Sequence, residues 1–278
     1  MTEPQLEVAF GAASHQGLVR GANEDSYLTA PPVFLVADGM GGHSDGELAS
    51  RAVVDAFSGL SSRRWLTPDL LVDAVARAAS TVSGLHADGR RPGSTLTGVG
   101  LTQQGGLPCW LVFNIGDSRT HLLRDGELTQ LTHDHSWVQS LIDEGKITPQ
   151  QATVHPHRSL ILKVLNGQAA FEPDLDVLDA QLGDRVMFCS DGLSGLVDDA
   201  TMAELLATDD LEAARQGDAD FGIDGAGFDG VDAAVKDIAG TDFHGGAPDS
   251  VDGLLPLYAV AFATCNHSAV QHLWPAIC

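Results

Sequence analysis

Apolar and polar residues alternate along this chain with two different periods. The stretches LEVAFGAAS (residues 6–14) and VFLVAD (33–38) are rich in β-branched and aromatic residues and predict strands. From Glu47 the apolar residues keep helical spacing, at positions Leu48, Ala52, Val53, Ala56, Phe57 and Leu60. Thr67 and Pro68 predict the start of a second helix, with an apolar face formed by Leu71, Val75, Ala78, Val82 and Leu85.

A strand-like pattern returns between Thr95 and Leu131. The apolar runs TLTGVGLT, CWLVFNIG and RTHLLRDGELTQL are separated or interrupted by Gly105-Gly106 and Asp125-Gly126, which are typical of tight hairpin turns. We expect an antiparallel meander here. Ser136 then predicts a short helix ending near Gly145, and Thr148-Pro149 predicts another.

The next segment contains two more strands, in LDVLDAQLGDRVMFC, and a helix around DATMAELLAT. Strands and helices do not alternate as βαβ units, so the fold class is α+β, with two antiparallel sheets and helices outside them. No linker divides the chain before about residue 240. The segment 241–278 has weak periodicity and predicts no structure.

Charge and composition narrow the function. The 278 residues are 44% hydrophobic, enough for a packed core, and carry a net charge of −23. Such a charge repels nucleic acid and anionic membranes. The longest apolar stretch is too short to span a membrane, and the four cysteines form no C-x-x-C pair. We therefore expect a cytoplasmic protein with no membrane span.

Three aspartates share the same local pattern. Asp38 in VADGMGG, Asp117 in NIGDSR and Asp191 in FCSDGL each end an apolar run and precede Gly or Ser. Aspartate before glycine is also ordinary turn chemistry. As a set, however, aspartates at strand ends can meet at one rim of a sheet, where clustered carboxylates require a hard cation.

The segment GLVRGANEDS adds groups of another kind. Arg20 offers a planar set of donors suited to phosphate, and Glu24 and Asp25 follow shortly after it. Beside a metal cluster they would supply a phosphate anchor and carboxylates that orient metal-bound water.

At this point the chain resembles a known family, the metal-dependent serine/threonine protein phosphatases of the 2C type in their compact bacterial form. The resemblance rests on seven motifs in register over about residues 6 to 215: RGANEDS (20–26), VADGMGGHSDGELAS (36–50), GSTL (93–96), NIGDSR (114–119), LTHDHSWVQSLIDEGKIT (131–148), HPHRS (155–159) and CSDGL (189–193). It implies a β-sandwich of two antiparallel sheets flanked by paired helices, forming a domain over 1–240 with a flap at about 136–160.

The resemblance also implies roles for individual residues. Asp38 resembles the carboxylate that bridges two metals, with the Gly39 carbonyl on one of them, and Asp191 looks like a ligand of the other. Asp117 resembles the residue that helps to hold a weaker third metal. Arg20 matches the arginine that binds phosphate.

The reaction that this implies is hydrolysis of phosphoserine and phosphothreonine in proteins. Two Mn²⁺ or Mg²⁺ ions sharing a water lower its pKa and supply hydroxide near neutral pH, without a covalent enzyme intermediate. The expected partners are phosphorylated proteins, including a Ser/Thr protein kinase and its substrates, acted on by a monomer. Hydrolysis of a small phosphorylated metabolite is a weaker hypothesis.

Two departures from the family affect the site. Many eukaryotic relatives carry a histidine, proposed as a general acid, where this chain has Met40, so metal-bound water or His43 would have to serve. The four flap-region histidines are interpreted as structural or surface residues: His133, His135, His155 and His157.

The larger departure is near the C-terminus. The family ends with a Gly-Gly-x-Asp-Asn motif and an apolar strand, and the best counterpart here is GAGFDGVDAAVKDI, residues 225–238. Asp229 would then be the metal ligand, although Gly230 replaces the asparagine and Lys236 interrupts the strand. The Gly/Asp-rich segment 217–230, which leads into this motif, is atypical and could be a flexible acidic loop or a calcium loop.

The alternative to an enzyme is a pseudophosphatase or regulatory binding module with a degraded metal site.

Overall fold

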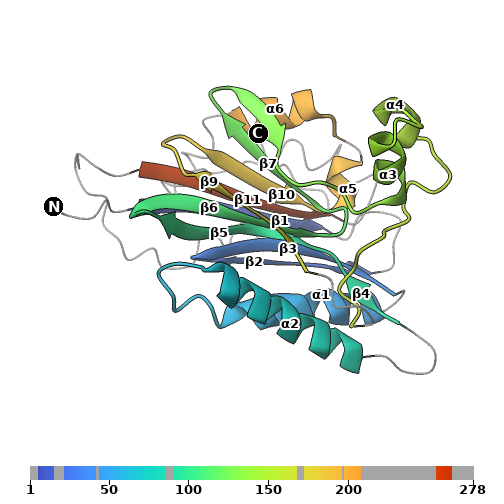
Figure 1. The fold of residues 1–278 in the computed structure, drawn as a ribbon, viewed down its shortest axis with the longest axis horizontal. Helices are drawn as coiled ribbons and strands as arrows, with labels where there is room; N and C mark the ends of the chain where they lie inside the picture. The colour runs from blue at the N-terminus through green and yellow to red at the C-terminus, as the bar shows by residue number, and fades with distance from the viewer. Residues whose placement is uncertain are drawn as a thin grey trace, which may run out of the picture.

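Two β-sheets stacked face to face form the centre of the molecule. The computed structural model describes residues 6–15, 22–41, 44–85, 91–167, 172–195, 197–207 and 255–264. Helices α1 and α2 cover the outer face of one sheet, and α5 and α6 lie on the side of the other (Figure 1). The expected α+β sandwich is therefore confirmed.

The first sheet has six strands and is antiparallel throughout. Its order is β2-β3-β5-β6-β9, with the short β4 paired to β3. The strands are β2 (Asp25–Ala30), β3 (Val33–Met40), β4 (Gly93–Ser94), β5 (Leu96–Gln104), β6 (Leu107–Ile115) and β9 (Asp174–Asp179).

The second sheet has five strands in the order β1-β11-β10-β7-β8. These are β1 (Leu6–His15), β11 (Leu255–Thr264), β10 (Arg185–Cys189), β7 (Arg119–Arg124) and β8 (Glu127–Gln130). β11 runs parallel to both of its neighbours, whereas the other pairings are antiparallel. Part of the C-terminal segment that predicted no structure thus forms a central strand.

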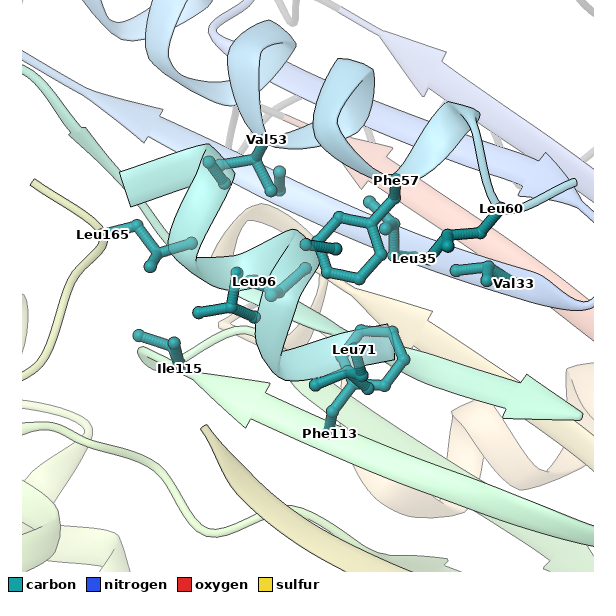
Figure 2. Close-up of a cluster of buried hydrophobic side chains, with 14 of the residues drawn as sticks. Val33, Leu35, Val53, Phe57, Leu60, Leu71, Leu96, Phe113, Ile115 and Leu165 are labelled. Atoms are coloured by element: carbon teal, nitrogen blue, oxygen red, sulfur yellow. The ribbon is translucent and has the colours of Figure 1, made fainter. Parts of the chain in front are cut away.

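The expected helices are present. α1 (Ser44–Ser58) and α2 (Pro68–Gly84) begin and end close to the predicted positions, and Thr67 caps α2 through a bond from the Leu70 amide to its hydroxyl. Their apolar faces pack on odd-numbered residues of β3, including Val33 and Leu35, as Figure 2 shows. Each such side chain contributes about 1.5–3 kcal/mol when it is fully buried.

A second core fills the space between the two sheets. It contains the even-numbered β3 residues Phe34 and Val36 together with Trp110, Val186 and Phe188. Because side chains alternate between the faces of a strand, this pattern fixes which later residues of each strand point between the sheets.

The predicted meander is wrong in one respect. β5 and β6 pair in the six-stranded sheet, but β7 and β8 pair in the five-stranded sheet. The chain crosses between the sheets through Gly116, which has φ +110° and whose Cβ, if present, would lie 2.6 Å from the Thr95 methyl. Only glycine fits both constraints.

Four shorter helices complete the described structure. The flap region contains α3 (Trp137–Asp143), capped by Ser136, and α4 (Pro149–Ala152), in which Thr148 and Gln151 form a capping box. α5 (Asp191–Ser194) starts directly after β10, and α6 (Asp199–Ala207) follows it. None of the helices in the described segments is long and apolar enough to cross a membrane.

Candidate metal centre

Asp38 points between the two sheets at one end of the sandwich. It shares the face of β3 that carries Phe34 and Val36, which lie in the core between the sheets. In the neighbouring strand, Asp25 is directly opposite Asp38 and shares the face that carries Tyr27. Strand alternation and register therefore bring two carboxylates together.

Ser190 connects this pair to the other sheet. It follows β10 on the same face as Phe188, and its hydroxyl donates a hydrogen bond of 2.8 Å to Asp25 Oδ2. Ser190 is fully buried. The bond joins the strand that leads to Asp191 to the strand that carries Asp25.

Buried hydroxyl groups hold the backbone of Asp38. The Asp38 amide donates to Thr95 Oγ1 at 2.9 Å, and the Thr95 amide donates to the Asp38 carbonyl at 2.9 Å. Thr95 Oγ1 lies 2.7 Å from Ser118 Oγ, next to Asp117 in the sequence. This chain of contacts links the two segments that carry Asp38 and Asp117.

Glycine is required where α1 approaches the end of β3. The Gly39 amide donates to the Glu24 carbonyl at 3.1 Å, and a Cβ on Gly39 would overlap the Gly46 carbonyl of α1. A Cβ on Gly46 would lie 2.6 Å from Glu24 Oε1. The glycine-rich sequence after Asp38 thus lets the helix start close to the carboxylates.

The electrostatics show that the carboxylates of the two sheets lie near one another. Burial raises the pKa of Asp38 well above its ordinary value, and the charges of Asp25, Asp191 and Asp117 raise it further. Burial also raises the pKa of Asp117 to about 7, assisted by Asp191 and Asp134 and opposed by Arg119. The charges of the three aspartates predicted from the sequence therefore act on one another, and we refer to Asp38, Asp117 and Asp191 together as the acidic cluster.

The chemistry of this cluster suits a hard divalent cation. Carboxylate and carbonyl oxygens are the ligands that Mg²⁺ and Mn²⁺ prefer, and a cation would offset the mutual repulsion. Asp117 Oδ1 is buried and has no hydrogen-bond partner among the described residues. Among the described residues, however, no group of three or more Asp, Glu, His or Cys side chains is arranged so that it could hold a metal ion.

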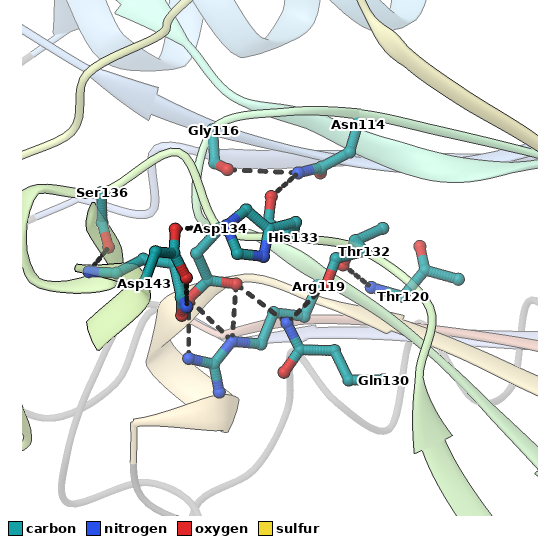
Figure 3. Close-up of polar contacts among 11 residues, drawn as sticks. Asn114, Gly116, Arg119, Thr120, Gln130, Thr132, His133, Asp134, Ser136 and Asp143 are labelled. Atoms are coloured by element: carbon teal, nitrogen blue, oxygen red, sulfur yellow. Dashed lines mark hydrogen bonds and ion pairs between the residues drawn. The ribbon is translucent and has the colours of Figure 1, made fainter. Parts of the chain in front are cut away.

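An ion pair that the sequence did not predict joins the start of β7, two residues after Asp117, to the segment that precedes the flap. Arg119 donates from Nε and Nη2 to both oxygens of Asp134, at 2.7–3.0 Å (Figure 3). Gln130 Nε2 also donates to Asp134 Oδ1 at 3.0 Å. Sequence reasoning missed Asp134 although it lies within the LTHDHS motif, because nothing in a single sequence marks it as the partner of Arg119.

Several predicted site residues fall outside the described segments. Arg20, Asp229 and His43 do so, and so does the Gly/Asp-rich segment 217–230. Met40 ends β3 and pairs with Gly93 of β4. Among the flap-region histidines, His133 is exposed whereas His135 is buried.

A family model and the related proteins all point to the same class of enzyme, the protein phosphatases. The family model described as Protein phosphatase 2C matches residues 21–217. The serine/threonine protein phosphatase PstP of Mycobacterium tuberculosis is 40% identical over 249 residues, which are 87% of this chain and 47% of that protein. This chain therefore spans about half the length of that relative.

A shorter relative is covered more fully. The serine/threonine phosphatase stp of Listeria innocua is 32% identical over 204 residues, which are 69% of this chain and 80% of that protein. Among solved structures, the catalytic domain of PstP in complex with two manganese ions matches with a TM-score of 0.64 and 35% identity, covering 82% of this chain and 91% of that one.

Proposed function

The chain belongs to the protein phosphatase 2C family, and we propose that it hydrolyses phosphoserine and phosphothreonine in proteins with the help of divalent cations. The observation that supports the proposal is the pairing of Asp25 with Asp38 between the sheets, where Ser190 binds Asp25 and the charges of Asp117 and Asp191 act on Asp38. A manganese-bound structure of a related catalytic domain supports the choice of cation.

The proposed metal ligands are Asp38, the Gly39 carbonyl and Asp191, with Asp117 serving a weaker third ion and Asp229 completing the set. When bound, two Mn²⁺ or Mg²⁺ ions would lower the pKa of a shared water and offset the charge of the phosphate group. Glu24 and Asp25 would not bind the ions directly but would orient the ligands and the metal-bound water.

The chain's own residues would prepare the site in two ways. Thr95 fixes the backbone of Asp38, so the main chain that carries this carboxylate does not have to be ordered when ions bind. Arg20 would bind the phosphate oxygens of the substrate through its planar donors. We propose Ser/Thr protein kinase targets as substrates by family analogy alone; the expected cytoplasmic location and monomeric state stay predictions.

The test is hydrolysis of p-nitrophenyl phosphate and a phosphothreonine peptide with Mn²⁺. We expect Asp38→Asn to lose at least about a hundredfold in kcat/KM, because one charge at the centre of the cluster disappears without a change in shape. Asp73→Asn, on the exposed face of α2, is the matched control and should retain activity. Wild-type turnover no higher than that of Asp38→Asn would overturn the proposal.

A second candidate is a pseudophosphatase that retains the sandwich but binds cations poorly. It is favoured by the altered sequence around Asp229 and by the incomplete ligand set among the described residues. Calorimetric titration with Mn²⁺ distinguishes the two candidates. Tight binding of two ions excludes the pseudophosphatase, whereas no saturable binding in a folded protein favours it.

A further inference from the structure

His135 lies at the junction between the flap region and the turn that carries Asp117. The Gly116 amide donates a hydrogen bond of 3.0 Å to His135 Nδ1, and the His135 amide donates one of 2.9 Å to the Gly116 carbonyl. His135 is only 7% exposed. Through its ring and its own amide, His135 therefore binds both the N–H and the carbonyl of Gly116, the residue before Asp117.

The other side of the imidazole is also anchored. His135 Nε2 lies 3.0 Å from Asp174 Oδ2 on β9, and Lys163 donates to Asp174 Oδ1 at 3.0 Å. Because Nδ1 accepts a hydrogen from Gly116, the proton of the neutral ring is on Nε2, which donates to Asp174 and also lies 3.1 Å from Lys163 Nζ. Burial lowers the pKa of His135, and the positive charge of Lys163 acts in the same direction while Asp174 opposes it.

Gly116 transmits this constraint to the acidic cluster. With φ +110° it makes the crossing between the sheets, and it packs so closely against Thr95 that no side chain would fit. Thr95 in turn accepts the hydrogen bond of the Asp38 amide. A shift of Gly116 would therefore move Asp117 directly and disturb the support of Asp38.

We propose that His135 is a positioning residue, which fixes the Gly116–Asp117 turn through Nδ1 and thereby holds the Asp117 carboxylate in the acidic cluster. The role in metal binding rests on the proposed function, whereas the hydrogen bond to Gly116 can be tested without it. The flap region and the weaker cation site are then connected by one side chain at the start of the flap.

Two substitutions of His135 by amide side chains distinguish the roles of the two ring nitrogens. His135→Asn places an amide oxygen near the position of Nδ1 and can accept the Gly116 hydrogen, but it does not reach Asp174 as the ring does. His135→Gln extends toward Asp174 and removes the acceptor beside Gly116. The exposed His133, which lies 2.9 Å from Asp143, provides the control His133→Gln.

The first readout is hydrogen exchange of the Gly116 amide in metal-free protein, with folding checked by circular dichroism. We expect His135→Gln to exchange at least about tenfold faster than wild type, and His135→Asn to stay within about threefold, because only the latter keeps the acceptor. His133→Gln should match wild type. Equal exchange in the Asn and Gln variants would overturn the proposal.

The second readout is calorimetric binding of Mn²⁺. We expect the affinity of the weakest Mn²⁺ site to fall about tenfold in His135→Gln. In His135→Asn this affinity should return close to that of wild type. Unchanged Mn²⁺ binding in a folded His135→Gln protein that has lost Gly116 protection would overturn the positioning role. If wild type neither binds Mn²⁺ nor hydrolyses phosphopeptide, the proposed function fails, and the exchange comparison still decides the link to Gly116.

Discussion

Ser190 Oγ donates a 2.8 Å hydrogen bond to Asp25 Oδ2, joining two residues that are 165 positions apart in the chain. The bond runs from the end of β10 in one sheet to the start of β2 in the other. Ser190 precedes Asp191, and Asp25 faces Asp38, so this one contact ties together carboxylates from both sheets.

Ser190→Ala should weaken both the fold and cation binding. Loss of the buried donor leaves a carboxylate oxygen of Asp25 without this bond, which destabilises the protein by about 1–3 kcal/mol. We expect a lower urea midpoint and weaker Mn²⁺ binding by calorimetry. Ser80→Ala, on the exposed face of α2, is the control. A Ser190→Ala protein with wild-type stability and affinity would show that the bond has no positioning role.

Gly39→Ala should disrupt the approach of α1 to the carboxylates. Its Cβ would overlap the backbone of Gly46 and lie 2.6 Å from the Glu24 carbonyl, and neither can move without displacing a helix or strand. We expect a loss of at least about 2 kcal/mol in the free energy of unfolding, together with weaker Mn²⁺ binding. Gly84→Ala, where an added Cβ meets nothing within 4 Å, should be neutral.

The raised pKa of Asp117 should make metal-free protein less stable as pH rises. Its pKa is about 7 in the folded protein against an ordinary value of 3.8, so between these pH values the folded state retains a proton that the unfolded state has released. Stability falls with pH wherever the folded state binds more protons. Urea unfolding in EDTA at about pH 5 and about pH 7.5 should show this decrease.

Asp117→Asn should reduce that pH dependence, because the amide does not titrate. Adding Mn²⁺ to wild type should restore stability most strongly near neutral pH, where the cation replaces the lost proton. The exposed Asp73→Asn serves as the control. An Asp117→Asn protein with the same pH dependence as wild type would contradict the assigned pKa shift.

Asp184→Ala should affect stability alone. The buried Asp184 accepts bonds from Trp110 Nε1 at 3.0 Å and from Arg124 Nε at 2.7 Å. Leaving these donors unpaired should lower the free energy of unfolding by about 2–4 kcal/mol. Because Asp184 precedes β10 and Ser190 follows it, Mn²⁺ affinity measured well below the melting temperature should stay within about twofold of wild type. A large loss of affinity would contradict this separation.

The amino-acid sequence by itself determined most of the local structure, although it did not mark the strands β2, β4 and β11. Helical spacing, the cap at Thr67 and the turn residues Asp125-Gly126 depend on neighbours in the chain, and these predictions are confirmed. The sequence also marked Asp38, Asp117 and Asp191 as residues at the ends of apolar runs. Such features are readable because periodicity and capping act over a few residues.

The tertiary structure alone decided how these pieces meet. It separated β7 and β8 from β5 and β6, placed β11 between β1 and β10, and brought Ser190 to Asp25 and His135 to Gly116. Each of these contacts joins residues distant in sequence, whose pairing is set by register and by packing between sheets. One sequence contains no local signal for either, so the candidate ligands were predictable but the groups that hold them in place were not.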